Sequence, residues 1–166
     1  MNLNKKMEGA LDAQLQLEAY SSYLYLSMSA FCHSINLKGF GHWMRQQSHE
    51  EHHHAMKIFD YMVERGNWVS LLALEKPAHA FKSVRDVIES SLAHEQKVTA
   101  QIHKLYELAG QQKDYATQMM LQWFITEQVE EEATVKEILE KLKRISDKGS
   151  AILYLDKELG KRAATT

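Results

Sequence analysis

The chain has 166 residues and a mass of 19.2 kDa, with 45% apolar and 25% charged residues, which suits one globular domain with a full core and excludes a disordered chain. Lys and Arg number 20 against 22 Asp and Glu, so a formal charge of -2 offers no basic field to hold nucleic acid or an anionic membrane surface. The only cysteine, Cys32, excludes a disulfide framework within the chain and any site built from four cysteines.

The N-terminal segment, residues 1–6, is polar and lacks the apolar run of a signal peptide. No stretch approaches the roughly 18 uninterrupted apolar residues that a membrane span needs. We therefore expect a cytoplasmic protein whose partners include neither a membrane nor nucleic acid.

Helix breakers are scarce, with one proline and seven glycines in the whole chain, and they fall between long segments whose apolar residues recur at helical spacing. We therefore predict an all-α protein that forms a single domain over residues 1–166. Four long helices are predicted over residues 5–34, 41–65, 83–110 and 114–146, followed by a short amphipathic helix over residues 150–159. Ser83 is suited to cap the third helix, since Asp86 follows three positions later.

The lengths of the connections predict the topology. The turns around residues 36–40 and 110–113 are short, which makes the helices on either side of them antiparallel. Residues 67–82 form a connection that, fully extended, covers roughly 53 Å, whereas a helix of 26 residues is only about 39 Å long. The second and third helices can therefore run parallel, giving two antiparallel pairs joined by one long crossover, as in ferritin-like four-helix bundles.

Each long helix places an acidic side chain on its apolar face. In the third helix, for example, Glu95 lies where the spacing of Ile88, Leu92 and Val98 would call for a leucine. The polar residues on these faces are Glu18 in the first helix, Glu51 and His54 in the second, Glu95 in the third, and Gln128 and Glu131 in the fourth.

Several buried carboxylates repel one another and each costs free energy to desolvate. Arg45 and Lys57 lie six positions either side of Glu51 and are rotated off its line, so neither neutralises it. A single such Glu, or a lone Glu-x-x-His, is more simply a boundary or chance feature, but acids on four separate helices favour bound cations. Glu51 and His54 have the i, i+3 spacing of di-iron carboxylate bundles, and carboxylates with one imidazole suit Fe(II) or Mn(II) better than zinc or copper.

Several segments spread over nearly the whole chain carry a resemblance to one family. They are Leu-Glu-Ala-Tyr-Ser-Ser at 17–22 followed by Tyr25, His-Glu-Glu-His-His-His at 49–54, Glu-Gln at 95–96, Leu-Gln-Trp-Phe at 121–124, Glu-Gln-Val-Glu-Glu-Glu at 127–132, and Tyr-Leu-Asp-Lys-Glu-Leu at 154–159. They are similar to motifs of the bacterial non-haem ferritins, and together they are specific for that family.

The resemblance implies a ferroxidase and iron-storage protein. Such a protein forms a shell of 24 subunits, oxidises Fe(II) with dioxygen or hydrogen peroxide, and deposits ferric oxyhydroxide mineral inside the shell. It further implies a di-iron centre within each subunit, bridged by Glu51. The first iron would be bound by Glu18, Glu51 and His54, and the second by Glu51, Glu95 and Glu131, with Gln128 beside it.

The resemblance also implies a third iron site on the inner side of this centre. Its ligands would be Glu50, Glu127, Glu130 and Glu131, and we call the first three of these the third ligand set. Tyr25 would lie nearby as a one-electron donor. Trp123 would lie nearby too, although plain core packing explains that residue equally well.

The helical wheel of the second helix agrees with this assignment. With Glu51 at zero and about 100° per residue, His54 lies about 60° away and Glu50 about 40° beyond it, so the three share one sector. His49 and His53 fall near the opposite side of the wheel. We therefore expect these two histidines on the surface rather than among the ligands.

Departures from related families narrow the assignment. Haem-binding bacterioferritins have a haem-ligating methionine at the position of His52 in this chain. They also have a second Glu-x-x-His motif at the position of Gln128-x-x-Glu131. Histidine can also bind haem, but we expect no haem in this protein. Rubrerythrins need four cysteines for their iron–sulfur module. Mini-ferritins that protect DNA take ligands from a histidine-bearing first helix, whereas here that helix has only His33, near its end.

Two alternatives stay open. A di-iron oxidase or peroxidase that stores nothing would use the same ligands without a closed shell. A metal-free helical interaction protein would keep its inward acids neutral or solvated. The sequence leaves undecided the roles of His49, His52, His53 and Cys32. For Cys32, a packed, reduced thiol is the simpler account.

Overall fold

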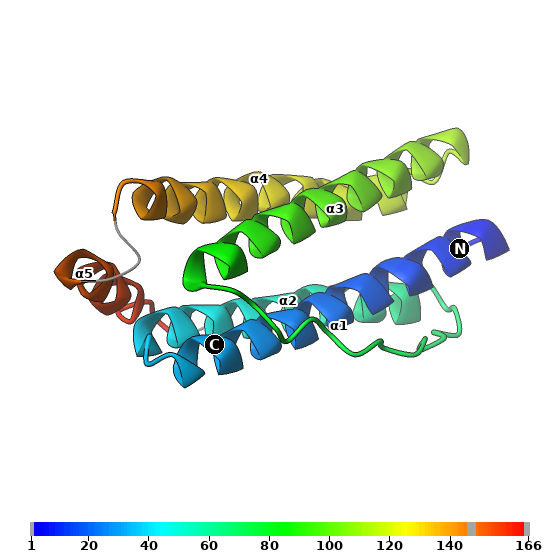
Figure 1. The fold of residues 1–166 in the computed structure, drawn as a ribbon. Helices are drawn as coiled ribbons and strands as arrows, with labels where there is room; N and C mark the ends of the chain where they lie inside the picture. Colours follow the sequence, from blue (N-terminus) through cyan, green and yellow to red (C-terminus); the bar gives the residue numbers. More distant parts are fainter. Residues whose placement is uncertain (1, 146–148, 165–166) are drawn as a thin grey trace.

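The computed structural model describes residues 2–145 and 149–164, and within them it contains five helices (Figure 1). They are α1 (Lys5–Ser34), α2 (Lys38–Glu64), α3 (Val84–Gln111), α4 (Tyr115–Lys143) and α5 (Ser150–Leu159). No strand occurs in these residues, and the predicted all-α class is confirmed. None of the described helices is both long and apolar enough to cross a lipid bilayer.

The four long helices form two antiparallel pairs, α1 with α2 and α3 with α4, and α1 also contacts α3. Figure 1 shows the connection from α2 to α3 running along the length of the bundle, so that α2 and α3 point the same way. The connection is tied to α1, since Asp12 accepts a hydrogen bond from the Ser70 N–H (3.0 Å) and the Ser27 hydroxyl donates to the Ala78 carbonyl (2.7 Å). The predicted four-helix bundle with a long crossover and a short C-terminal helix is confirmed.

The first turn of α2 differs from the sequence prediction. The helix begins at Lys38 rather than at residue 41, because Gly39 serves close packing rather than a turn. A Cβ atom at Gly39 would lie 1.7 Å from the backbone oxygen of Asp156 in α5. The Phe40 N–H donates to the Asp156 side chain at 2.9 Å, which fixes the start of α2 to α5. At its other end, α4 stops at Lys143, whereas the predicted end at residue 146 lies outside the described residues.

Side-chain caps define the starts of α1, α3 and α4. Asn4 accepts hydrogen bonds from two N–H groups of the first turn of α1, and Ser83 accepts one from the Asp86 N–H, so the predicted cap of α3 is confirmed. Asp114 caps α4 and also forms an ion pair of 3.0 Å with Arg65, just past the end of α2. This pair fastens the ends of the two helix pairs together.

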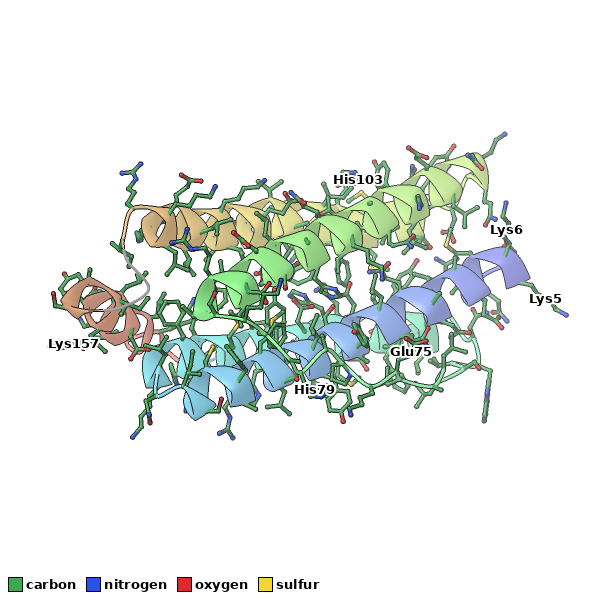
Figure 2. All side chains as sticks on the ribbon, viewed as in Figure 1. Lys5, Lys6, Glu75, His79, His103 and Lys157 are labelled. Atoms are coloured by element: carbon green, nitrogen blue, oxygen red, sulfur yellow. The ribbon has the colours of Figure 1, made fainter. Side chains whose placement is uncertain are left out.

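The core consists of two apolar layers with a polar layer between them. The layer nearer α5 includes Met28, Phe40, Met44, Ile88 and Val135. The layer nearer the N-terminus includes Leu11, Ile58, Ile102, Leu121 and Phe124. Figure 2 shows how charged side chains such as Lys5 and Lys157 project away from the bundle. Because these charged side chains lie at the surface, the polar layer inside the bundle needs its own explanation.

Candidate metal centre

The polar layer is built from the inward acids that the sequence indicates. None of its predicted ligands is more than 6% exposed: Glu18 from α1, Glu51 and His54 from α2, Glu95 from α3, and Gln128 and Glu131 from α4. Each projects from the middle of its helix, where the apolar stripe is interrupted. Four carboxyl groups held out of water in one layer require protonation or a bound cation.

Two groups of potential ligand atoms come together in this layer. One oxygen each of Glu18 and Glu51 and a ring nitrogen of His54 all lie within 4.8 Å of one another. A second group, with the same spacing, combines His54 with Glu127 and Glu131. The first group is the set assigned to the first iron. The second group links Glu127, a member of the third ligand set, to the centre through His54. The sequence did not indicate this link.

Glu51 lies at the middle of the layer, close to Glu18 and His54. Neither of its buried oxygens has a hydrogen-bond partner among the described residues, nor does Oε2 of Glu18. The nearest nitrogen, Nδ1 of His54, is 3.5 Å from Glu51 Oε2, too far for a firm hydrogen bond. The other Glu18 oxygen accepts a 2.7 Å hydrogen bond from the amide of Gln14. Three buried carboxylate oxygens are therefore open to a cation.

Glu95 differs from the other acids because protein donors already bind it. The Tyr25 hydroxyl donates to one of its oxygens, and the Gln128 amide donates to the other at 3.1 Å. Tyr25 also contacts the Ser91 hydroxyl at 2.9 Å. Glu95 belongs to neither of the two groups of potential ligand atoms, so the set assigned to the second iron is not gathered as closely as the first. Binding by Glu95 would require its contacts with Tyr25 and Gln128 to rearrange.

The electrostatics of the layer favour protons or cations. Burial, with the charge of Glu95 adding to it, raises the pKa of Glu18 to about 7 and that of Glu131 to about 8. The pKa of Glu51 is raised well above its usual value by burial and then by the charges of Glu95, Glu18 and Glu131. A divalent cation would relieve both the desolvation cost and this repulsion.

His54 is held in the neutral form that binds metals. Burial, followed by the charges of His53 and Lys57, lowers its pKa to about 4. Its ring packs edge-on against Trp123 and Phe124, with centroids 5.4 Å and 6.1 Å away. Trp123 is 39% exposed and carries Lys57 Nζ 4.3 Å from its ring centroid, so it covers His54 at the surface and is not a core residue.

The third ligand set lies beside the centre and is partly exposed. Burial raises the pKa of Glu127, and the charges of Glu130 and Glu50 raise it further, so both of these carboxyl groups are close enough to repel that of Glu127. Glu130 is exposed. Glu50 forms a 2.5 Å ion pair with Arg162, a residue that the sequence did not bring into the site. The guanidinium of Arg162 also donates to Gln47.

The remaining histidines and the thiol take no part in these groups. His49, His52 and His53 are exposed, as the helical wheel predicts for the first and the last. Cys32 is buried in the apolar layer nearer α5, and burial raises the pKa of its thiol to about 12. The structure therefore contains a packed thiol, and its raised pKa favours the protonated form.

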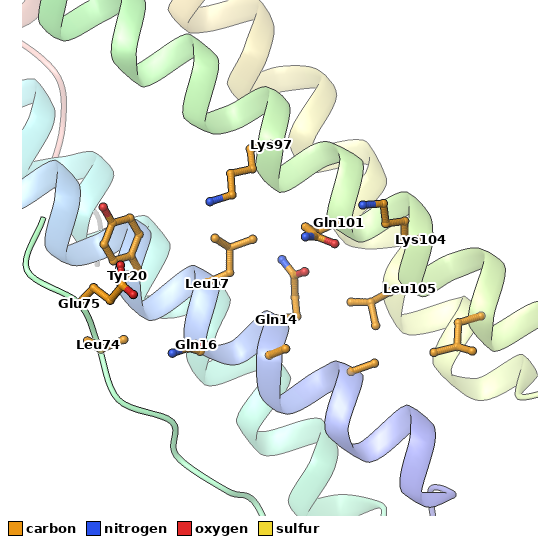
Figure 3. A pocket seen from close by; sticks show the side chains of 13 residues that line it. Gln14, Gln16, Leu17, Tyr20, Leu74, Glu75, Lys97, Gln101, Lys104 and Leu105 are labelled. Carbon is orange, nitrogen blue, oxygen red and sulfur yellow. The ribbon is translucent and has the colours of Figure 1, made fainter. Parts of the chain in front are cut away.

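A separate pocket of about 600 Å³ opens between α1, α3 and the crossover (Figure 3). Gln14, Tyr20, Leu74, Lys97 and Gln101 are among the residues that line it. Figure 3 shows Gln14 reaching from α1 toward Gln101 on α3. No candidate ligand lines the pocket, but Gln14 joins it to the metal centre because its amide donates to Glu18. The position of Gln14, four residues before Glu18, is a signal that sequence reasoning could have used.

Known proteins share this architecture and sequence. The ferritin-like domain family matches residues 8–145. A bacterial non-heme ferritin of Staphylococcus saprophyticus is 39% identical over 97% of this chain and 96% of its own length. A probable bacterial non-heme ferritin-like protein of Haemophilus influenzae is 37% identical over 95% of this chain and 96% of its own length.

Solved structures agree over the same extent. An Archaeoglobus fulgidus ferritin engineered into a closed form is 49% identical, with a TM-score of 0.97 over 99% of this chain and all of that one. An open pore ferritin from the same archaeon is also 49% identical, with a TM-score of 0.95 over 97% of this chain and 98% of that one. This chain belongs to the ferritin family.

Proposed function

We propose that this protein is a cytoplasmic iron-storage protein with ferroxidase activity. Each subunit oxidises Fe(II) with dioxygen or hydrogen peroxide at the centre formed around Glu51, and a shell of 24 subunits holds the ferric oxyhydroxide product. The observation that carries the proposal is the buried Glu51 carboxyl group, which has no hydrogen-bond partner among the described residues and lies against Glu18 and His54.

The donor set suits iron as a substrate in both oxidation states. Carboxylate oxygens are hard donors that bind Fe(II) and, more strongly, Fe(III), and the neutral imidazole of His54 completes a mixed oxygen and nitrogen set. Glu51 has two open oxygens, so it can bridge two ions. Two Fe(II) ions give up two electrons, which with two protons reduce dioxygen to hydrogen peroxide or hydrogen peroxide to water.

The neighbouring residues have supporting roles in this proposal. Glu131 and Glu95 bind the second ion, Glu95 after exchanging its contacts with Tyr25 and Gln128 for the metal. Tyr25 lies one hydrogen bond from Glu95 and is placed to donate an electron. The third ligand set receives a third ion next to Glu131, on the route away from the centre. No haem takes part.

Storage requires self-assembly, and the crossover offers a surface for it. Trp68 and Leu71 on this segment are 86% and 75% exposed in the single chain. Large apolar side chains exposed at this level are typical of a surface that another subunit covers. A closed shell of such subunits is what the proposed storage function needs.

The proposal is tested by stopped-flow oxidation of Fe(II) in air, titrated by iron equivalents per subunit. The parent protein is expected to show a fast phase that saturates at two or three irons per subunit. Glu51→Ala and His54→Ala are expected to lose this phase while the shell stays assembled, because each removes a ligand atom of the first group.

Exposed residues of the same helix supply matched controls. Glu64→Ala and His49→Ala change the same residue types at exposed positions of α2 and are expected to oxidise iron as the parent does. Oxidation by the Glu51 and His54 variants at the parent's rate would show that the assigned centre is wrong. A parent protein no faster than buffer alone would remove the ferroxidase activity.

A further inference from the structure

The C-terminal segment after α5 returns to the bundle and lies against α2. The backbone oxygen of Arg162 is 2.9 Å from Nε2 of His42, and its guanidinium lies 4.8 Å from the ring centroid of Trp43. α5 itself is fixed to the first turn of α2, where the Phe40 N–H donates to Asp156. Arg162 is thus held beside the metal centre by one contact of its backbone oxygen and one of its guanidinium.

The guanidinium of Arg162 makes two directed contacts with groups at the centre. One nitrogen forms an ion pair of 2.5 Å with Oε2 of Glu50, and the other donates to Oε1 of Gln47 at 2.5 Å. Gln47 is fully buried, and its amide in turn donates to Oε2 of Glu131 at 2.7 Å. A continuous path of polar contacts therefore runs from Arg162 through Gln47 to a proposed iron ligand.

The charges around this path are mostly negative. The charges of Glu50 and Glu130 act on Glu127, and the charge of Glu50 also acts on Glu131. A guanidinium stays protonated at any physiological pH and binds carboxylates through a rigid fork. Arg162 thus places a permanent positive charge against Oε2 of Glu50, where it opposes a metal ion that this residue would bind.

We propose that Arg162 is a positioning residue that competes with metal ions for Glu50 and orients Glu131 through Gln47. This inference rests on the proposed function, since it concerns the third ion of that centre. While Arg162 holds Glu50, an ion next to Glu131 lacks one carboxylate ligand and faces a positive charge. The third ion is therefore held weakly, which suits a site that must pass its iron onward rather than keep it.

The affinity of the third ion is the quantity to measure. The metal-free assembled protein is titrated with Co(II), which air does not oxidise at neutral pH, and binding is followed by calorimetry and by the visible absorption of bound cobalt. Arg162→Ala and Arg162→Gln each remove a unit charge in direct contact with Glu50. The affinity for the third Co(II) equivalent is therefore expected to rise about tenfold in both variants. The first equivalent, which Glu18, Glu51 and His54 bind, is expected to stay within about twofold of the parent.

Three further variants separate charge competition from a structural role. Lys161→Ala removes the same charge from an exposed neighbour that pairs with Glu158, and it is expected to leave all equivalents unchanged. Arg162→Lys keeps the charge but not the fork, so its third equivalent is expected to stay near that of the parent. In the double variant Glu50→Gln, Arg162→Gln, the gain in affinity is expected to disappear.

The outcomes distinguish this inference from the proposed function. If Arg162→Gln still binds two ions but shows no new or tighter third equivalent, the proposed role of Arg162 is wrong and the proposed function is unaffected. A parent protein that binds no Co(II) at all overturns the proposed function instead. Thermal unfolding together with particle mass shows whether each variant is folded. If Arg162→Ala is not folded, Arg162→Gln decides.

Discussion

At the scale of single residues, the centre depends on which carboxylate oxygens have protein donors and which do not. Both oxygens of Glu95 are occupied by Tyr25 and Gln128, whereas those of Glu51 are open. Glu18 is intermediate, with one oxygen bound by Gln14. These differences divide the three similar side chains into one with both oxygens open, one that is partly held, and one whose hydrogen bonds would have to rearrange before it bound a metal.

The hydrogen bond from Gln14 should affect how protons and metal ions compete for the Glu18 carboxylate. The amide donates to Glu18 and holds down a pKa that burial raises to about 7, so Gln14→Leu should raise that pKa further. Because metal binding requires the deprotonated carboxylate, Co(II) affinity at pH 6.5 is expected to fall about tenfold and to recover at pH 8.5. Calorimetric titration at the two pH values measures this.

A neighbouring glutamine gives the control for that experiment. Gln16 bonds to the Ala73 carbonyl on the crossover and has no contact with the centre in the described structure, so Gln16→Leu should leave the affinity unchanged at both pH values. An equal loss in Gln14→Leu at pH 6.5 and 8.5 would contradict the role given to its hydrogen bond.

At the scale of elements, the close contact between α2 and α5 fixes where the C-terminal segment lies. Gly39→Ala would place a methyl group 1.7 Å from the Asp156 carbonyl oxygen, so α5 must move away from α2. Overpacking of this kind costs about 1–3 kcal/mol or more. We expect hydrogen exchange in α5 to become faster in this variant, and the contacts of Arg162 with α2 to be lost with it.

Gly9→Ala is the matched control for this change. A Cβ there meets no atom within 4 Å, and the position lies inside α1. Alanine is favoured over glycine in a helix interior by about 0.5–1 kcal/mol, so this variant should be slightly more stable. Unchanged exchange in α5 of Gly39→Ala would show that the contact is looser than described.

At the scale of the whole molecule, the metal-free protein carries strain from its buried acids. Because the pKa values of Glu18, Glu51 and Glu131 are raised on folding, the folded state keeps protons that the unfolded chain releases, and the unfolding free energy falls as pH rises. His54 and His94 have lowered pKa values and act oppositely, but only below their usual pKa of about 6.5.

Between pH 6.5 and 8, the carboxyl groups alone should therefore set the trend. The melting temperature of the metal-free protein is expected to fall over this range, with about 1.4 kcal/mol lost per pH unit for each proton released. Saturation with Co(II) should flatten or reverse the trend, and Glu51→Gln should reduce it. A melting temperature of the metal-free parent that rises over this range would contradict the assigned burial of the acids.

Particle mass tests the proposed shell. Native mass measurement of the parent is expected to give 24 copies of the 19.2 kDa chain. Trp68→Asp should give smaller particles, because a charge would replace an apolar side chain at the proposed subunit contact, while the polar control Glu75→Gln on the same crossover should not. A parent that is only a dimer would favour the oxidase or peroxidase that stores nothing.

The sequence alone was sufficient for the helices, the crossover and the inward acids. Helical periodicity and the positions of glycine and proline act locally, so the four long helices could be placed to within a few residues. The length of the connection between α2 and α3 allowed the parallel direction that the structure shows. Interruption of an apolar stripe is also a local property, so Glu18, Glu51, Glu95 and Glu131 could be identified one helix at a time.

Only the tertiary structure decided which of these groups meet and which are already bound. The start of α2 at Lys38 depends on α5, more than 100 residues later in the chain, packing onto Gly39. The binding of Glu95 by Tyr25 and the pairing of Glu50 with Arg162 likewise join residues 70 and 112 positions apart. No local pattern encodes such pairs, because they form only when whole helices pack and bring distant side chains to one place.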